Sequence, residues 1–172
     1  MPLSTPRDFF LHELADMMSL EHIFPSMMGE AQKEVRLADA KQAIKEHEAE
    51  TKGHIKTLQE VFKALGEKPD ETTCYAAQGL QQEHQSLHEE NPSPEVLEMG
   101  VIGGASRQEQ YEIAAYTGLV QMARDLGERD VARMLQENLD QEKAMAKRVE
   151  MIAKELGKRS GESPKAGAAS RA

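Results

Sequence analysis

Six side chains that can ligate metal ions fall on or beside the apolar faces of four long helical segments. They are Glu21, Glu50, His54, Glu109, Glu112 and Glu142. An ionised carboxylate in an apolar interior is too costly to keep unless a positive charge compensates it. Carboxylate oxygens and imidazole nitrogens suit iron and manganese, and zinc also accepts them. The residue types therefore predict a buried metal site.

The apolar stripes themselves contain no lysine or arginine that would neutralise these glutamates. Glu21 lies in the middle of the stripe from Phe10 to Met28, and Glu142 lies centrally in the last one. Glu109 and Glu112 lie one helical turn apart on the same face. Carboxylates that converge without a basic side chain need another positive charge, and a pair of divalent ions supplies it. We therefore predict two metal ions.

Some residues allow two interpretations. His47 lies on the stripe of the second segment and is an alternative ligand to His54. Tyr116, one turn after Glu112, either packs in the core or donates a hydrogen bond to a ligand. His84 and His88 have the i,i+4 spacing of a metal clip, but their polar neighbours favour a solvated helix face.

The periodicity of the apolar residues predicts an all-α chain, with no segment that alternates like a strand. The expected helices span about 5–30, 34–65, 71–90, 94–127 and 128–156. Thr5 and Pro6 favour the first helix start, Pro25 favours a kink, and Gly66, Gly127 and Gly157 favour helix ends. We expect a four-helix bundle over residues 1–157 with an additional short helix in its long connection. Residues 158–172 are expected to be a disordered basic tail.

Charge and composition exclude several classes of partner. The 172 residues carry a net charge of −9. Four basic residues and one acidic residue in 158–172 give that segment +3, which leaves −12 on residues 1–157. Such a body repels phosphate backbones, so we expect no nucleic-acid partner. No apolar run is long enough for a membrane helix, and no secretory signal opens the chain, so a cytoplasmic location is expected. The single cysteine, Cys74, excludes an internal disulfide framework.

Four local strings resemble the YciE/YciF family of bacterial ferritin-like proteins. They are residues 14–16 with Glu21, residues 47–55, residues 109–116 and residues 139–144. The resemblance covers about residues 5–157, although the family usually has His where this chain has Gln110. It implies a ferritin-like four-helix bundle with one long connection, which is often a homodimer and is associated with stress responses. It also implies that the five glutamates occupy ligand positions of a di-iron site.

Two positions depart from the wider ferritin-like superfamily. That superfamily commonly places a His three residues after a ligand Glu, where this chain has Gly53 and Met145. His54 replaces the first of these one residue late, and no residue replaces the second. We therefore expect the ion near Glu142 to be more open to water or more weakly bound.

The leading hypothesis is a di-iron carboxylate protein, with manganese or zinc as alternative metals. In it, Glu50, Glu112 or both bridge the ions, and the remaining ligands bind terminally. Two adjacent ferrous ions would supply two electrons to O₂ or peroxide. The alternatives are a manganese-type catalase and a non-catalytic helical bundle that acts through oligomerisation or partner binding. The sequence does not decide whether the protein is an enzyme.

Overall fold

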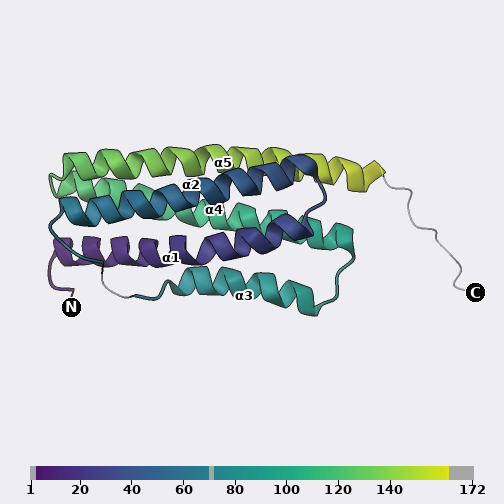
Figure 1. Ribbon diagram of the computed structural model, residues 1–172, viewed down its shortest axis with the longest axis horizontal. Helices are drawn as coiled ribbons and strands as arrows, with labels where there is room; N and C mark the ends of the chain where they lie inside the picture. Colours follow the sequence, from purple (N-terminus) through teal and green to yellow (C-terminus); the bar gives the residue numbers. More distant parts are fainter. Residues whose placement is uncertain (1–2, 70–71, 163–172) are drawn as a thin grey trace, which may run out of the picture.

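The computed structural model describes residues 3–69 and 72–162 and consists of five helices (Figure 1). They are α1 (Pro6–Glu34), α2 (Ala38–Ala64), α3 (Tyr75–Glu89), α4 (Pro94–Asp125) and α5 (Arg129–Glu162). These two stretches contain no strand. The predicted all-α class is confirmed, and so is the short helix in the connection between the second and third long helices.

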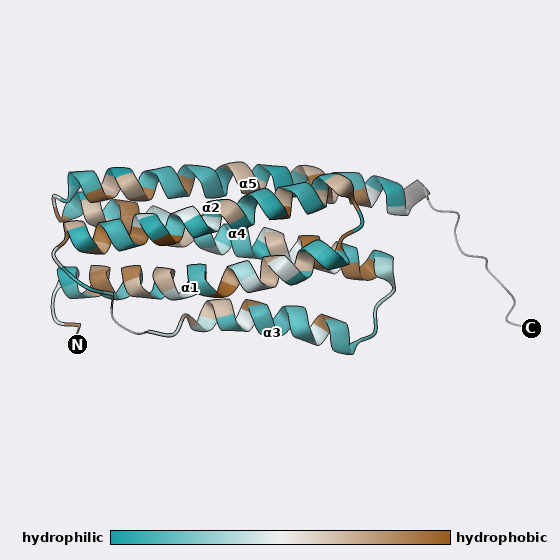
Figure 2. Cartoon of the chain, in the orientation of Figure 1, coloured by the Kyte–Doolittle hydropathy of each residue, from teal (hydrophilic) through white to brown (hydrophobic). Residues whose placement is uncertain are grey.

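The four long helices form a bundle in which each packs against two others. α1 contacts α2 and α4, and α5 contacts the same two helices from the opposite side. α3 lies outside this bundle against α1 and α4 (Figure 1). Hydrophilic and hydrophobic residues alternate along every helix, as expected where one side faces the core and the other faces solvent (Figure 2). None of the described helices is long and apolar enough to cross a membrane.

Several helix ends follow the predicted local signals. Thr5 Oγ1 accepts a hydrogen bond from the Asp8 amide, and the Asp8 carboxylate accepts one from the Thr5 amide, which completes a capping box. Gly66 and Gly127 adopt φ values of +73° and +81° directly after the ends of α2 and α4. A residue other than glycine would be strained in this left-handed conformation. The predicted helix ends at Gly66 and Gly127 are therefore confirmed.

Other predicted helix ends are wrong. α1 continues through Pro25 to Glu34, and α2 begins only at Ala38, so Glu34 closes the first helix and does not open the second. α3 begins at Tyr75, four residues later than expected. α5 runs past Gly157 to residue 162, because a glycine without a left-handed turn does not end a helix. The rest of the predicted tail, residues 163–172, lies outside the described residues.

α3 packs against the bundle through one side, where it contacts α1 and α4. Its one fully buried residue is Ala77, although Cys74, which directly precedes the helix, is buried as well. Near its other end, Leu87 packs over Gly100 of α4, where a Cβ atom would collide with the leucine side chain. Gly100 therefore leaves room for the Leu87 side chain against the backbone of α4.

Candidate metal centre

Six acidic and imidazole side chains meet in the middle of the bundle. They come from all four long helices and are Glu21 of α1, His47 and His54 of α2, Glu109 and Glu112 of α4, and Glu142 of α5. None of them is more than 1% exposed. The apolar stripes bring them together, because residues one or two turns apart on the buried face of each helix point to the same axis.

The six side chains form two groups that share one residue. In the first group, His47 Nε2 lies 3.3 Å from Glu109 Oε1 and 3.5 Å from Glu142 Oε2, and Glu112 completes the set. In the second group, His54 Nδ1 lies 2.9 Å from Glu142 Oε1 and 3.3 Å from Glu21 Oε1. Within each group, one ligand atom per residue lies within 4.8 Å of the others. Glu142 belongs to both groups.

Although several nitrogens and oxygens of this centre lie within ion-pair distance of one another, many of its ligand atoms form no well-aligned hydrogen bond with any described residue. They include both carboxylate oxygens of Glu112 and of Glu142, Nε2 of His47 and Nδ1 of His54. Ionised carboxylates only accept hydrogen bonds, so clustered glutamates cannot satisfy one another. Buried polar atoms without partners are rare in stable proteins. A set of four carboxylates and two imidazoles that face each other in this way fits divalent metal ions.

The electrostatics of the metal-free centre point the same way. Burial raises the pKa of Glu112 well above its usual value, and the neighbouring Glu142, Glu21 and Glu109 raise it further. Burial opposes a proton on His54, but the carboxylates of Glu142 and Glu21 raise its pKa to about 10. Both shifts favour protonated side chains in a centre without cations. Metal binding would have to displace these protons.

Each histidine is held on its outer side by an oxygen acceptor. His47 Nδ1 lies 3.2 Å from Glu50 Oε2, and His54 Nε2 lies 2.7 Å from Gln141 Oε1. If the outer nitrogen of each ring donates its proton to this acceptor, the lone pair of the inner nitrogen points into the centre. This arrangement is typical of histidines that bind metals, whose second ring nitrogen donates to a carboxylate, a carbonyl or water.

Tyr116 is hydrogen-bonded to the second group. Its hydroxyl donates to Glu21 Oε1 and accepts a bond of 2.9 Å from Asn138 Nδ2. The sequence left two roles open for Tyr116, core packing or hydrogen bonding to a ligand. In the structure the side chain is fully buried and also donates a hydrogen bond to Glu21, a predicted ligand.

The structure brings together Glu21, His54, Glu109, Glu112 and Glu142 but leaves Glu50 outside both groups. The Glu50 side chain is 42% exposed and touches the outer nitrogen of His47, so a bridging role does not fit its position. His47, the alternative ligand, takes its place, and the residue common to both groups is Glu142. The stripe of α2 already held His47 on its buried face and Glu50 on its flank.

Gln141 and Asn138 were not anticipated as functional residues. Asn138 interrupts the apolar stripe of α5, which is a usable signal, whereas Gln141 is one of many polar residues on that helix.

A pocket of about 770 Å³ leads to the centre from the side of α3. His47 and Glu109 line it, together with apolar side chains such as Met27, Met28 and Met145. α3 forms another part of the wall, including His84. The pocket gives small molecules a route to the first group of ligands.

Comparisons with known proteins agree with this architecture. Residues 5–161 match the model of DUF892, a domain of unknown function. The chain is 32% identical over 145 residues to protein YciF of Escherichia coli strain K12. The aligned region covers 84% of this chain and 87% of YciF. The crystal structure of the E. coli stress protein YciF matches with a TM-score of 0.87 at 29% identity, covering 91% of this chain and 99% of that chain.

Two further solved structures are similar. YcfI, a proposed structural protein from Rhodopseudomonas palustris, matches with a TM-score of 0.84 at 32% identity, covering 87% of this chain and 95% of that one. A protein from Xanthomonas campestris pv. campestris matches with a TM-score of 0.71 at 22% identity, covering 91% of this chain and 99% of that one. The last match concerns the fold alone.

Proposed function

The chain belongs to the DUF892 family, and from its buried centre we propose that it is a di-iron carboxylate protein that reacts with O₂ or peroxide. One observation carries the proposal: two groups of buried ligand atoms share Glu142, and their inner atoms lack hydrogen-bond donors. Such a centre is costly without cations and well suited to them. The relative YciF is described as a stress protein, and we extend a stress-related role to this chain.

In this proposal, His47, Glu109 and Glu112 would hold one ion, and Glu21 and His54 would hold the other. Glu142 would contribute to both sets, because its two oxygens lie toward the two histidines. Iron supplies, when bound as a ferrous pair, two electrons for the reduction of O₂ or peroxide. Oxygen and nitrogen ligands without a thiolate suit iron or manganese better than soft metals.

The surrounding residues orient the ligands and control access. Glu50 and Gln141 fix the ring orientations of His47 and His54. Tyr116 holds a proton against Glu21 Oε1, so this oxygen has a hydrogen-bond donor that Glu112 lacks. The helices exclude bulk water, while the pocket beside His47 admits a molecule as small as O₂ or peroxide. The cytoplasmic location and the homodimer stay predictions.

Anaerobic loading with Fe(II) followed by exposure to air or peroxide tests the proposal. We expect about two irons per chain and a ferric absorption band that develops only after the oxidant is added. Glu112→Gln and Glu142→Gln should lose both the iron and the band. Glu98→Gln is the matched control, because Glu98 is a buried glutamate of α4 that lies outside both groups. Equal iron content in the parent and the two centre variants would show that the proposal is wrong.

The same preparations separate the two alternatives. Rapid release of oxygen from peroxide by the manganese-loaded protein, but not by the apoprotein, would favour a manganese-type catalase. A non-catalytic bundle predicts negligible metal content in every variant. It also predicts that leucine at the glutamate positions stabilises the fold, because no buried charge then needs compensation.

A further inference from the structure

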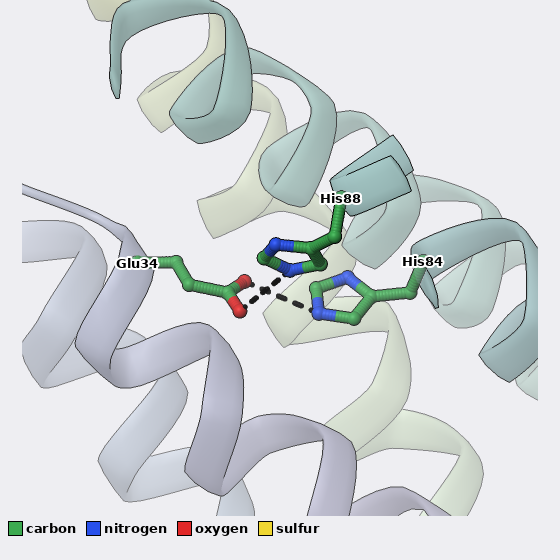
Figure 3. A group of neighbouring side chains, drawn as sticks. All are labelled: Glu34, His84 and His88. Carbon is green, nitrogen blue, oxygen red and sulfur yellow. Dashed lines mark ion pairs between the residues drawn. The ribbon is translucent and has the colours of Figure 1, made fainter. Parts of the chain in front are cut away.

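Three metal-ligating side chains meet outside the central cluster, where α3 lies against the end of α1. Glu34 is the last residue of α1, and His84 and His88 lie one turn apart on α3. Figure 3 shows both imidazole rings directed at the two oxygens of the Glu34 carboxylate. The three residues share no member with the two central groups.

The distances suit three ligands of a single ion. His84 Nε2 lies 3.2 Å from Glu34 Oε2, and His88 Nε2 lies 2.8 Å from Glu34 Oε1. All three ligand atoms lie within 4.8 Å of one another. Ligands about 2.0–2.1 Å from a tetrahedral zinc ion are separated by about 3.3 Å, so little movement is needed to bind one.

The ion pairs in this group leave two of its ligand atoms without a hydrogen bond. Glu34 Oε2 and His84 Nε2 are shielded from solvent and lie 3.2 Å apart, but neither forms a well-aligned hydrogen bond with any described residue. The side chains of Glu34 and His84 are 15% and 12% exposed, so little solvent is available to either group. Glu34 also stands at the C-terminal end of α1, where the helix dipole favours a positive charge.

We propose that Glu34, His84 and His88 form a peripheral site for a divalent transition-metal ion of the zinc type. Two imidazoles and one carboxylate are typical zinc ligands, and this set is too poor in oxygen for calcium or magnesium. His88 is 42% exposed, so an ion can enter from solvent and keep a water molecule as its fourth ligand.

The site would fasten the C-terminal half of α3 to the bundle. Within α3 only Ala77, near its start, is fully buried, so the half that carries His84 and His88 is held by partly buried side chains such as Leu87. Because His84 also lines the pocket that reaches His47 and Glu109, the ion would fix one wall of the route to the central cluster. Segments with few buried contacts open locally at low cost, and a bound ligand raises that cost.

Zinc binding to the metal-stripped protein, measured by competition with a chromophoric chelator, tests the site. The parent should bind about one more equivalent of zinc per chain than the His84→Ala/His88→Ala double variant. Zinc should also slow amide hydrogen exchange in residues 75–89 of the parent but not of the double variant. His22→Ala is the matched control, because His22 is an exposed histidine of α1 outside all three groups, and it should bind zinc like the parent.

The outcomes separate this site from the central one. Glu142→Gln should keep the peripheral equivalent even if it loses the central ions. His88→Ala alone removes a ligand whose side chain is 42% exposed, so loss of zinc there cannot be assigned to a folding defect. Equal zinc stoichiometry in the parent, the double variant and His88→Ala would overturn the proposal, as would unchanged exchange in α3 of the zinc-treated parent.

Discussion

Among the residues that the structure describes, glutamate is buried in two places, and its charge is compensated differently in each. Glu98 of α4 is 2% exposed, and its carboxylate accepts hydrogen bonds from the amides of Arg36 and Leu37 and from Arg36 Nε. Glu112, four turns further along the same helix, is fully buried, and neither of its oxygens has a partner among the described residues.

The pKa values of the two carboxyl groups move in opposite directions. Burial alone would raise the pKa of Glu98, but the hydrogen bonds from Leu37 and Arg36 together lower it. Burial raises the pKa of Glu112, and the adjacent carboxylates add to this. Burial by itself therefore does not distinguish a candidate metal ligand from a structural carboxylate. The absence of hydrogen-bond donors around a buried carboxylate does make it a candidate.

Removal of iron should have the largest effect, and it should act through the central cluster and not through Glu98. An ion present at 100 times its dissociation constant stabilises the folded state by about 2.7 kcal/mol, so two ions give about 5 kcal/mol. For a chain of this size that corresponds to a Tm higher by about 10–20 °C. Calorimetry of iron-loaded and chelator-treated protein measures it. Glu98→Ala should show the same metal-dependent rise in Tm as the parent. If iron does not raise the Tm of the parent, the central cluster does not differ from the Glu98 site in its need for cations.

Glu98→Ala should lower the free energy of unfolding by about 2–3 kcal/mol, with or without metal. The substitution leaves the buried Leu37 amide and the Arg36 amide without their acceptor at the start of α2. Because the pKa of Glu98 is lowered in the folded state, its stabilisation is present above the unfolded value of about 4.5 and is lost as the pH falls through the folded value. Urea unfolding at pH 7 and at lower pH measures the effect. A difference between parent and variant that grows on acidification would contradict it.

Glu112→Gln should stabilise the metal-free protein by about 1–2 kcal/mol at pH 6. The pKa of Glu112 is raised in the folded apoprotein, so its stability contribution is present below about 4.5 and declines as the pH rises toward the folded value. Glutamine carries no charge and removes this decline. Urea unfolding of chelator-treated protein at pH 4.5 and pH 6 measures it, and Gln110→Ala, at an exposed glutamine of the same helix, serves as a control that leaves the carboxylates in place. Loss of stability at pH 6 would indicate that Glu112 has a donor after all.

Much of the fold follows from local signals in the sequence. Helical periodicity predicted the buried faces, and Thr5, Gly66 and Gly127 marked helix ends that the structure confirms. Gly157 did not end α5, because a glycine stops a helix only where the tertiary structure demands a turn. The all-α class and the extra helix were therefore predictable, whereas several boundaries were not.

The sites were predictable only where one helix face determines them. The stripe of α2 placed His47 inside and Glu50 on the flank, but a preference for carboxylates as ligands favoured Glu50. The group of Glu34, His84 and His88 depends on where α1 ends relative to α3. The expected solvated face of the two histidines was reasonable from α3 alone, since the carboxylate they meet comes from another helix about fifty residues away.

Glu50→Gln should have the smallest effect and tests whether a partly exposed carboxylate still serves the buried cluster. Glu50 holds the outer nitrogen of His47, and loss of such a contact typically weakens metal binding by about 10-fold or more, or about 1.4 kcal/mol. Glutamine keeps an acceptor oxygen but not the charge, so we expect the lower end of that range. Competition with a chelator measures the affinity, and Glu48→Gln removes the same charge from α2 at a residue bonded to Lys52 and Gln32, not to His47. If both variants lose affinity equally, the loss comes from the change in net charge and not from the contact with His47. If only Glu50→Gln loses affinity, the cluster depends on an outer carboxylate that faces solvent. Glu98, by contrast, is buried and accepts its hydrogen bonds from Arg36 and Leu37.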